Sequence, residues 1–194
     1  MATNIEIEAK VLITKPEYEK IVKKYKGEEA KEFDQINYYI DTKNFDLKKV
    51  GIGLRIRLLN GVYNLTLKVP MGEGILEKNS IVSKKEYEDL LNNKHFPEND
   101  VSEFIRMLGY KTEDLLIVTS LETHRYDVNY GEDGSILSID KNTYNGVTDY
   151  ELEMGGTSLL KAKTLLQKIC NENGVEYEDN PRSKQTRALE SLTK

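Results

Sequence analysis

Charged residues separated by one position recur along the 194-residue chain, and these side chains are the ones best able to do chemistry. Because side chains alternate across a β-strand, each such pair places both charges on one face of its strand. The pairs are also sorted by sign, since Arg55 and Arg57 lie in the first half while Glu151 and Glu153 lie in the second. Carboxylates suit Mg²⁺, Mn²⁺ or Ca²⁺, and lysine and arginine suit phosphate oxygens.

The apolar faces of the same strands decide where the charged faces point. An ordinary antiparallel sheet would place its charged face in water. At least four amphipathic helices are expected, however, and the apolar strand faces are the only large surface on which they can pack. If the sheet curls closed under these helices, the charged faces line its interior. Buried charges must be paired or bound to a ligand, so we predict a metal-bound polyphosphate as the ligand.

Hydropathy alternation and turn residues predict the order of the elements. The first half contains strands at 5–13, 33–41, 54–59 and 62–69, with a helix after the capping box Thr14-Lys15-Pro16-Glu17. The second half contains strands at 75–82, 115–128, 136–143 and 147–154. Its helices are expected after the capping box Ser83-Lys84-Lys85-Glu86, at 101–108, from a cap at Thr157 to about Cys170, and from Asn180-Pro181 onward.

The two halves follow one pattern. Glu8 precedes its predicted helix cap Thr14 by six residues, and Glu77 precedes its predicted cap Ser83 by six. Each half also ends in a hairpin with an Asn-Gly turn. The pattern predicts a duplicated β-α-β-β-β unit within an α+β fold, and we expect residues 1–194 to form a single domain.

Composition excludes several classes of protein. The net charge of −5 argues against general binding to nucleic acid or to an anionic membrane. No run approaches the roughly 20 apolar residues of a membrane span, and the first residues do not resemble a signal peptide, so we expect a cytoplasmic protein. Cys170 is the only cysteine, which excludes an internal disulfide and a cysteine zinc cluster.

The charged positions also occur within a set of motifs that resembles a known family. The motifs are Glu6-Ile7-Glu8-Ala9-Lys10, Gln35-x-Asn37-Tyr38-Tyr39-x-Asp41, Leu54-Arg55-Ile56-Arg57, Leu65-Thr66-Leu67-Lys68, Glu77, Thr123-x-Arg125, Asp140, Glu151-Leu152-Glu153 and Ser183-Lys184-x-x-Arg187. In this order they resemble the CYTH, or triphosphate tunnel metalloenzyme, superfamily over roughly the whole chain. Where many relatives carry an arginine two residues before Glu77, this chain has Ile75.

The resemblance implies an eight-stranded antiparallel β-barrel that forms a tunnel flanked by helices. It implies that Mg²⁺ or Mn²⁺ is held by Glu6, Glu8, Asp140, Glu151 and Glu153. It implies that the triphosphate is held by Lys10, Arg55, Arg57, Lys68, Arg125, Lys184 and Arg187. The resemblance assigns catalytic roles to Lys10, Glu8 and Arg57, and it places Asn37, Tyr39, Asp41 and Glu77 in the tunnel lining.

Three functions are compatible with this resemblance. The first is metal-dependent hydrolysis of inorganic tripolyphosphate, thiamine triphosphate or a nucleoside triphosphate, in which a metal activates an in-line water. The second is a class IV-type adenylyl cyclase, and the third is a polyphosphate- or nucleotide-binding module without catalysis. The expected partner is a small-molecule triphosphate, with neither nucleic acid nor membrane, and a homodimer is a further option that the sequence leaves open.

Overall fold

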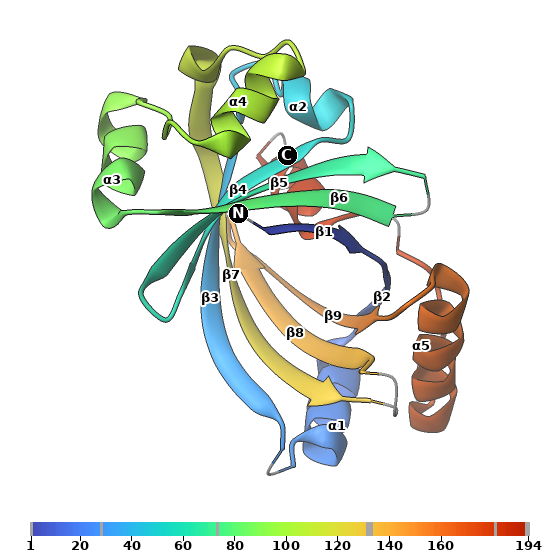
Figure 1. Cartoon of the computed structure of the whole chain (residues 1–194). Coiled ribbons are helices and arrows are strands. Elements are labelled where there is room, and N and C mark those ends of the chain that lie inside the picture. The colour runs from blue at the N-terminus through green and yellow to red at the C-terminus, as the bar shows by residue number, and fades with distance from the viewer. Residues whose placement is uncertain (1, 28, 73, 131–133, 181, 193–194) are drawn as a thin grey trace. The chain divides into compact units, whose positions relative to one another are not determined.

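The computed structural model describes residues 2–27, 29–72, 74–130, 134–180 and 182–192 and contains a nine-stranded sheet (Figure 1). The strands are β1 (Ala2–Glu6), β2 (Glu8–Ile13), β3 (Lys31–Thr42), β4 (Gly53–Leu59), β5 (Val62–Met71), β6 (Gly74–Val82), β7 (Leu115–Asn129), β8 (Ile136–Tyr144) and β9 (Val147–Gly155). Their order is β1-β6-β5-β4-β3-β7-β8-β9-β2. The helices and antiparallel strands confirm the α+β class.

The predicted first strand is interrupted at Ile7. Residues before it form β1 and pair with β6, whereas residues after it form β2 and pair with β9. The strands at the two ends of the sheet order are therefore consecutive in the chain. Counted as one interrupted strand, β1 and β2 bring the total to the expected eight.

Contacts divide the chain into two compact units. Unit 1 comprises the described residues of Met1–Ile5, Gln35–Leu121 and Lys184–Lys194, and unit 2 comprises those of Glu6–Asp34 and Glu122–Ser183. Strands β3 and β7 contribute residues to both units. Each unit has its own core, and the single domain expected for residues 1–194 stays a prediction.

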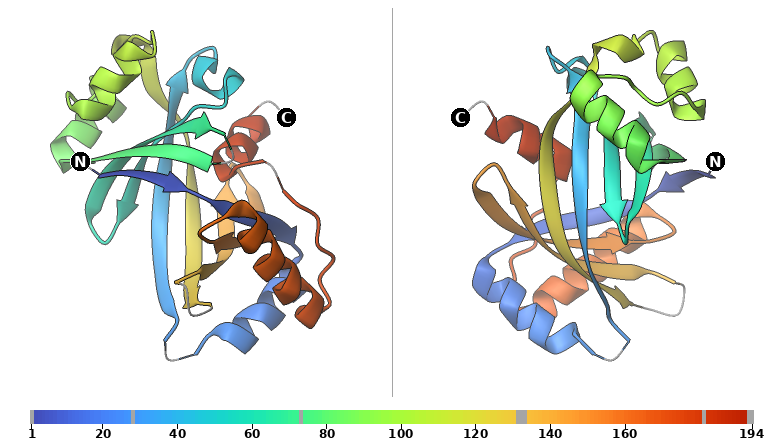
Figure 2. Two further views of the ribbon diagram at one scale, coloured as in Figure 1. Left: turned by 45° about the vertical axis from the view of Figure 1, so that its right-hand side comes forward. Right: turned by 90° about the vertical axis from the view of Figure 1, so that its left-hand side faces the viewer.

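In unit 1, helices cover the apolar face of strands β4 and β5. The helical segments of unit 1 are α2 (Asp46–Lys49), α3 (Lys84–Asn93), α4 (Asp100–Met107), the 3₁₀ turn η1 (Thr112–Asp114) and α6 (Lys184–Ser191). Of these, α2, α3 and α4 contribute buried residues to the apolar cluster on this face. Leu54 and Leu65 are fully buried in one apolar cluster with Leu90 of α3 and Ile105 of α4. Figure 2 shows α3 lying across these strands in its right-hand view. This packing leaves the charged face of the strands on the side away from α3 and α4.

In unit 2, α1 (Lys15–Tyr25) and α5 (Leu159–Asn173) cover the apolar face of the sheet. Ile21 of α1 and Leu166 of α5 are fully buried with Leu152 and Met154 of β9. Cys170 of α5 is also fully buried, as its sequence context predicts. The amphipathic helices therefore take the apolar strand faces in both units, as expected.

Local signals for two helix starts and two turns are confirmed. The Glu17 carboxylate accepts a hydrogen bond from the Thr14 backbone N–H at 2.6 Å, and Glu86 accepts one from Ser83 at 2.7 Å. These contacts begin α1 and α3. The turns at Asn60-Gly61 and Asn145-Gly146 place all four residues at positive φ, which matches the twist of a two-residue hairpin.

Other helix boundaries differ from the prediction. Ser158, rather than Thr157, caps α5, because the Ser158 hydroxyl accepts the hydrogen bond from the Lys161 N–H. Helix α6 begins at Lys184 instead of near Asn180, and Pro181 lies outside the described residues. The short α2 and η1 carried too few residues for a periodic signal. Within the described chain, no helix combines the length and the apolar character needed to cross a membrane.

Candidate functional site

The polar face of unit 1 is built from rows of residues paired across neighbouring strands. Asn37 of β3 lies opposite Arg57 of β4, and Tyr39 lies opposite Arg55. Arg55 in turn lies opposite Thr66 of β5. Directly opposed residues point to the same face of a sheet, so these side chains lie together on the face away from Leu54 and Leu65. The structure therefore brings together the arginines and lining residues that the sequence predicts for this half.

Several hydrogen-bond donors at this face are buried without a partner in the described part of the chain. The Asn37 side-chain oxygen accepts a hydrogen bond from Arg57 Nε at 3.0 Å, which leaves its amide nitrogen as the remaining donor. Among the described residues, the buried donor atoms without a hydrogen-bond partner include Asn37 Nδ2, the Tyr39 hydroxyl, Arg55 Nε and Gln185 Nε2. Such atoms cost about 1–3 kcal/mol each if nothing bonds to them. Together these donors form a site that can bind further hydrogen-bond acceptors.

Tyr39 lies among four positive charges of unit 1. Burial raises the pKa of the Tyr39 hydroxyl, while the nearby cations act to lower it. Those cations are Arg55 and Arg57 of β4 and Lys184 and Arg187 of α6. The hydroxyl therefore stays protonated at neutral pH and can donate a hydrogen bond to an anion.

Helix α6 approaches β4 at a glycine. A Cβ atom at Gly53 would lie 2.9 Å from Gln185 Oε1, closer than carbon and oxygen atoms normally pack. Glycine thus leaves room for the Gln185 side chain beside the strand. This close approach is consistent with the positions of Lys184 and Arg187 near Tyr39.

Two predicted lining carboxylates of unit 1 have partners within the protein. Glu77 pairs with Lys68 at 2.8 Å, and although burial acts to raise the pKa of Glu77, the Lys68 charge holds it below its ordinary value. Asp41 accepts hydrogen bonds from the backbone N–H groups of Thr42, Leu47 and Lys48 at 2.7 to 3.0 Å. Asp41 therefore anchors the start of α2, which is a structural role.

In unit 2, Arg125 of β7 binds two buried carboxylates. Its Nε and one terminal nitrogen donate to the two Asp140 oxygens at 2.7 and 2.6 Å. The terminal nitrogen also donates to Glu153 at 2.5 Å. Burial acts to lower the pKa of Arg125, but the two carboxylates raise it well above its ordinary value. Arg125 therefore stays charged and holds both carboxylates in place.

Three carboxylates of unit 2 form a compact acidic cluster. Asp140, Glu151 and Glu153 are all buried, and each offers an oxygen within 4.8 Å of the others. Lys10 of β2 pairs with Glu8 and lies 3.7 Å from Glu153. Oxygen ligands of this kind suit Mg²⁺ or Mn²⁺, so the donor set fits the predicted metal.

Glu6 and Glu8 lie on either side of the break at Ile7, because β1 ends at Glu6 and β2 begins at Glu8. Within the described residues, the acidic cluster of Asp140, Glu151 and Glu153 includes neither Glu6 nor Glu8. Their roles as metal ligands stay predictions, as do the individual roles of the other predicted site residues. The structure places two sets of residues, one basic in unit 1 and one acidic in unit 2.

The predicted duplication would relate these two sets. Arg55 in the β4–β5 hairpin and Asp140 in the β8–β9 hairpin each lie five residues before the asparagine of the hairpin turn. Lys68 in the β4–β5 hairpin and Glu153 in the β8–β9 hairpin each lie eight residues after that asparagine. The strand registers agree, since Arg55 pairs with Thr66 and Asp140 pairs with the equivalent Glu151. Corresponding positions of the two hairpins thus carry opposite charges.

Two site residues were not identified from the sequence. Asn180 donates from its side chain to Glu151 at 3.4 Å, and its backbone N–H donates to the Lys10 carbonyl at 2.9 Å. Gln185 supplies one of the buried donors. Gln185 immediately follows the predicted site residue Lys184, and this position was the sequence signal that could have identified it. No local pattern pointed to Asn180.

Comparison with known proteins gives one consistent result. The CYTH domain matches residues 4–185. YjbK of Bacillus subtilis (strain 168), a provisionally assigned triphosphatase, is 31% identical over 175 residues, which cover 90% of each chain.

Two solved structures also match. A provisionally assigned adenylate cyclase from Bacillus halodurans has a TM-score of 0.87 and 33% identity, covering 96% of this chain and 98% of its own. HpAC1 from Hippeastrum, a provisionally assigned adenylyl cyclase described as having a dominant triphosphatase activity, has a TM-score of 0.79 and 23% identity. That match covers 96% of this chain and 95% of the plant protein, and at this identity it supports the fold alone.

Proposed function

Because the chain belongs to the CYTH-domain family, we propose that it is a divalent-metal-dependent hydrolase of triphosphate substrates. The relative YjbK, which is 31% identical, carries a provisional triphosphatase name, and this supports the same reaction class here. Hydrolysis breaks the bond between the terminal phosphorus and its bridging oxygen. Water supplies the new oxygen of the released phosphate, the leaving inorganic or organic diphosphate takes the bond electrons, and the proton lost by water passes to solvent.

The group of unpartnered donors in unit 1 is the observation that carries this proposal. Asn37, Tyr39 and Arg55 each present a buried N–H or O–H group without a hydrogen-bond partner in the described structure. Four cations lie close enough to the Tyr39 hydroxyl to act against the rise of its pKa. A ligand that completes this group must offer many acceptor oxygens and carry several negative charges. A polyphosphate meets both requirements.

The residues of unit 1 serve as the phosphate-binding set in this proposal. Arg57 is oriented by its bond to Asn37, so its terminal nitrogens are directed before the substrate arrives. The positive charges of these residues stabilise the negative charge that develops on the transferring phosphoryl group. The members of this set are Arg55, Arg57, Lys68, Lys184 and Arg187.

The residues of unit 2 serve as the metal-binding set. We assign the metal to Glu151 and Glu153, with Glu6 and Glu8 as further ligands, and we assign Asp140 chiefly to holding Arg125. A bound Mg²⁺ or Mn²⁺ would neutralise phosphate oxygens and activate water. Lys10 is held by Glu8 and Glu153 and would bind a phosphate oxygen. That both sets act on one ligand stays a prediction, as do the cytoplasmic location and the homodimer.

A second candidate function is adenylyl cyclase activity. The observation that favours it is the 33% identity to the provisionally assigned adenylate cyclase of Bacillus halodurans. Both reactions need the same triphosphate and metal sites. They differ in the nucleophile, which is water in hydrolysis and the ribose 3′-hydroxyl in cyclisation.

An assay of product formation separates these functions. Phosphate release from tripolyphosphate, thiamine triphosphate and ATP is measured with Mg²⁺, with Mn²⁺ and with EDTA, and cyclic AMP is measured in the ATP reactions. The proposal expects metal-dependent phosphate release without cyclic AMP. Cyclic AMP as the main product would establish the cyclase, and calorimetric binding without any product would establish a binding module.

Two variants with matched controls test the two sets of residues. Arg57→Ala is expected to raise KM for the triphosphate, and Glu153→Gln is expected to raise the metal concentration needed for half-maximal rate. The exposed ion pair of Arg106 and Glu98 in unit 1 supplies Arg106→Ala and Glu98→Gln as controls. If Arg57→Ala and Glu153→Gln behave like the controls, the assignment of these residues is wrong.

A further inference from the structure

The segment that follows α5 in unit 2 is tied to β2 at Asn180. The backbone N–H of Asn180 donates to the carbonyl oxygen of Lys10 at 2.9 Å, and Asn180 is buried. One residue earlier, Asp179 pairs with Lys163 of α5 at 2.7 Å. These two contacts hold Asn180 next to the strand that carries Lys10, so its side chain has a fixed place.

The two ends of the Asn180 amide have different partners. Asn180 Oδ1 accepts a hydrogen bond from the backbone N–H of Arg182 at 3.2 Å, and Asn180 Nδ2 donates to Glu151 Oε1 at 3.4 Å. Because the amide oxygen serves the Arg182 N–H, the nitrogen is the end that faces Glu151. An amide N–H carries no net charge, so it can hold the Glu151 carboxylate without neutralising it.

The three carboxylates of the acidic cluster are held by different groups. The Arg125 guanidinium donates to Asp140 and Glu153, whereas Glu151 accepts a hydrogen bond from the Asn180 amide. A guanidinium compensates the charge of the carboxylates that it binds, and a neutral amide does not. Glu151 therefore receives an orienting hydrogen bond from a group that does not compete with a metal cation for its charge.

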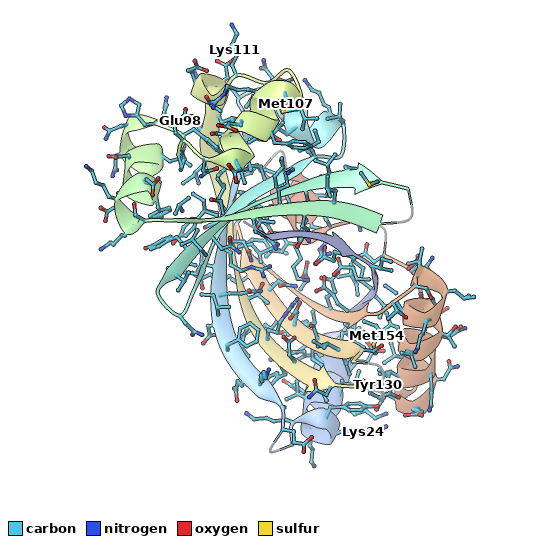
Figure 3. The ribbon with its side chains drawn as sticks, in the orientation of Figure 1. Lys24, Glu98, Met107, Lys111, Tyr130 and Met154 are labelled. Atoms are coloured by element: carbon cyan, nitrogen blue, oxygen red, sulfur yellow. The ribbon has the colours of Figure 1, made fainter. Side chains whose placement is uncertain are left out.

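Alternation along β9 places this contact on the polar side of the sheet. Leu152 and Met154 are fully buried in the apolar cluster that includes α5, and Figure 3 shows Met154 on the side of that helix. Glu151 and Glu153 alternate with these residues, so the two carboxylates point to the opposite face. Asn180 thus meets Glu151 at the acidic cluster, away from the apolar packing under α5.

We propose that Asn180 is a positioning residue of the metal-binding set, because its amide N–H fixes the orientation of the Glu151 carboxylate for a divalent cation. Its backbone N–H holds β2 at Lys10 at the same time. The inference rests on the proposed function, in which Glu151 is a metal ligand. Replacement of a residue that orients a metal ligand typically weakens metal binding by about 10–100-fold. Asn180 therefore acts on the metal through Glu151.

The simpler explanation is that Asn180 only shapes the turn that leads to Arg182. Asparagine commonly does so, because its side-chain oxygen accepts the backbone N–H two residues on, and a serine hydroxyl can replace that acceptor. The serine hydroxyl ends one bond nearer the backbone, so it cannot reach Glu151. Asn180→Ser therefore keeps the turn and removes the contact with Glu151, whereas Asn180→Ala removes both.

The test measures Mn²⁺ binding to the full chain by calorimetry, with circular dichroism to verify that each variant is folded. Asn180→Ser and Asn180→Ala should each raise the Kd of Mn²⁺ at least about tenfold. At saturating Mn²⁺, Asn180→Ser should change KM for tripolyphosphate less than about twofold, because the phosphate-binding set is unaltered. A Kd for Asn180→Ser equal to that of the unaltered chain would overturn the inference, as would a rise in KM as large as the rise in Kd.

Asn93→Ser is the matched control. Asn93 of α3 donates to Asp89 at the same distance of 3.4 Å, but on an exposed surface of unit 1, so its replacement should leave the Kd of Mn²⁺ unchanged. Phosphate release from the same samples separates this inference from the proposed function. If Asn180→Ser weakens Mn²⁺ binding but no triphosphate is hydrolysed by the unaltered chain, the proposed function fails and the role of Asn180 stands. If the unaltered chain binds no Mn²⁺, both fail.

Discussion

Replacement of Arg125 by glutamine is expected to destabilise the folded chain by about 3–5 kcal/mol in the absence of divalent metal. The guanidinium makes three charge-assisted hydrogen bonds of 2.5 to 2.7 Å to Asp140 and Glu153. The side chains are 15%, 0% and 10% exposed, so solvent screens these charges little. Glutamine would leave the acidic cluster of Asp140, Glu151 and Glu153 without its central positive charge. Removal of one partner from such a buried group is costly because the remaining charges stay desolvated.

Urea denaturation in EDTA, followed by circular dichroism, measures this loss. For a slope of about 2 kcal/mol per molar urea, a loss of about 4 kcal/mol lowers the midpoint by about 2 M. Arg106→Gln is the control, since Arg106 and Glu98 are 41% and 70% exposed and such a surface pair contributes less than about 1 kcal/mol. If Arg125→Gln moves the midpoint no further than Arg106→Gln does, the buried network does not exist in solution.

Divalent metal should restore part of the stability that Arg125→Gln removes. A ligand that binds only the folded state stabilises it by about 2.7 kcal/mol at a concentration 100 times its Kd. Mg²⁺ or Mn²⁺ is expected to raise the stability of the variant more than that of the unaltered chain. The reason is that the variant lacks the Arg125 positive charge that balances the acidic cluster. Equal gains would contradict metal binding at Glu151 and Glu153.

Three further predictions concern single residues. Asn37→Ala removes the acceptor that orients Arg57, so KM for the hydrolysed triphosphate should rise about tenfold in initial-rate assays, equivalent to about 1.4 kcal/mol. Gly146→Ala places a Cβ at a φ of +78°, and thermal denaturation should show a loss of at least about 1 kcal/mol. Burial raises the pKa of Cys170 to about 11 from 9.0, so the folded thiol should not react with Ellman's reagent at pH 8. Because the unfolded thiol ionises first, stability should fall as the pH rises from about 9 to about 11. An unchanged KM in Asn37→Ala would contradict the first prediction, and an unchanged melting temperature in Gly146→Ala would contradict the second. Rapid reaction of Cys170 with Ellman's reagent would contradict the third.

Local structure was largely predictable because short-range chemistry determines it. The capping pairs Thr14 with Glu17 and Ser83 with Glu86 act over three residues, and the Asn-Gly turns act over two, so each is visible in the sequence. The strand faces were predictable for a similar reason, since alternation alone separates Arg55 and Arg57 from the buried Leu54.

Boundaries without such local pairs were predicted less well. The start of α6 was placed near Asn180, yet Asn180 instead bonds to Lys10 and Glu151, which are distant in the chain. The lining role of Asp41 stays a prediction, and the sequence does not show that its carboxylate binds the backbone N–H groups of Leu47 and Lys48. In both cases the partner that decides the role lies several residues to well over a hundred residues away.

The sequence by itself determined which residues carry charge, on which strand face each charge lies and to which family the motifs belong. Tertiary structure alone decided which groups are paired. It joined Arg125 to Asp140 and Glu153, and it left the side-chain nitrogen of Asn37 and the hydroxyl of Tyr39 without partners among the residues that the structure describes. Strand register and burial set these outcomes, because a hydrogen bond needs its two atoms within about 3 Å. Alternation along a strand specifies a face, but it does not specify the neighbour on the next strand.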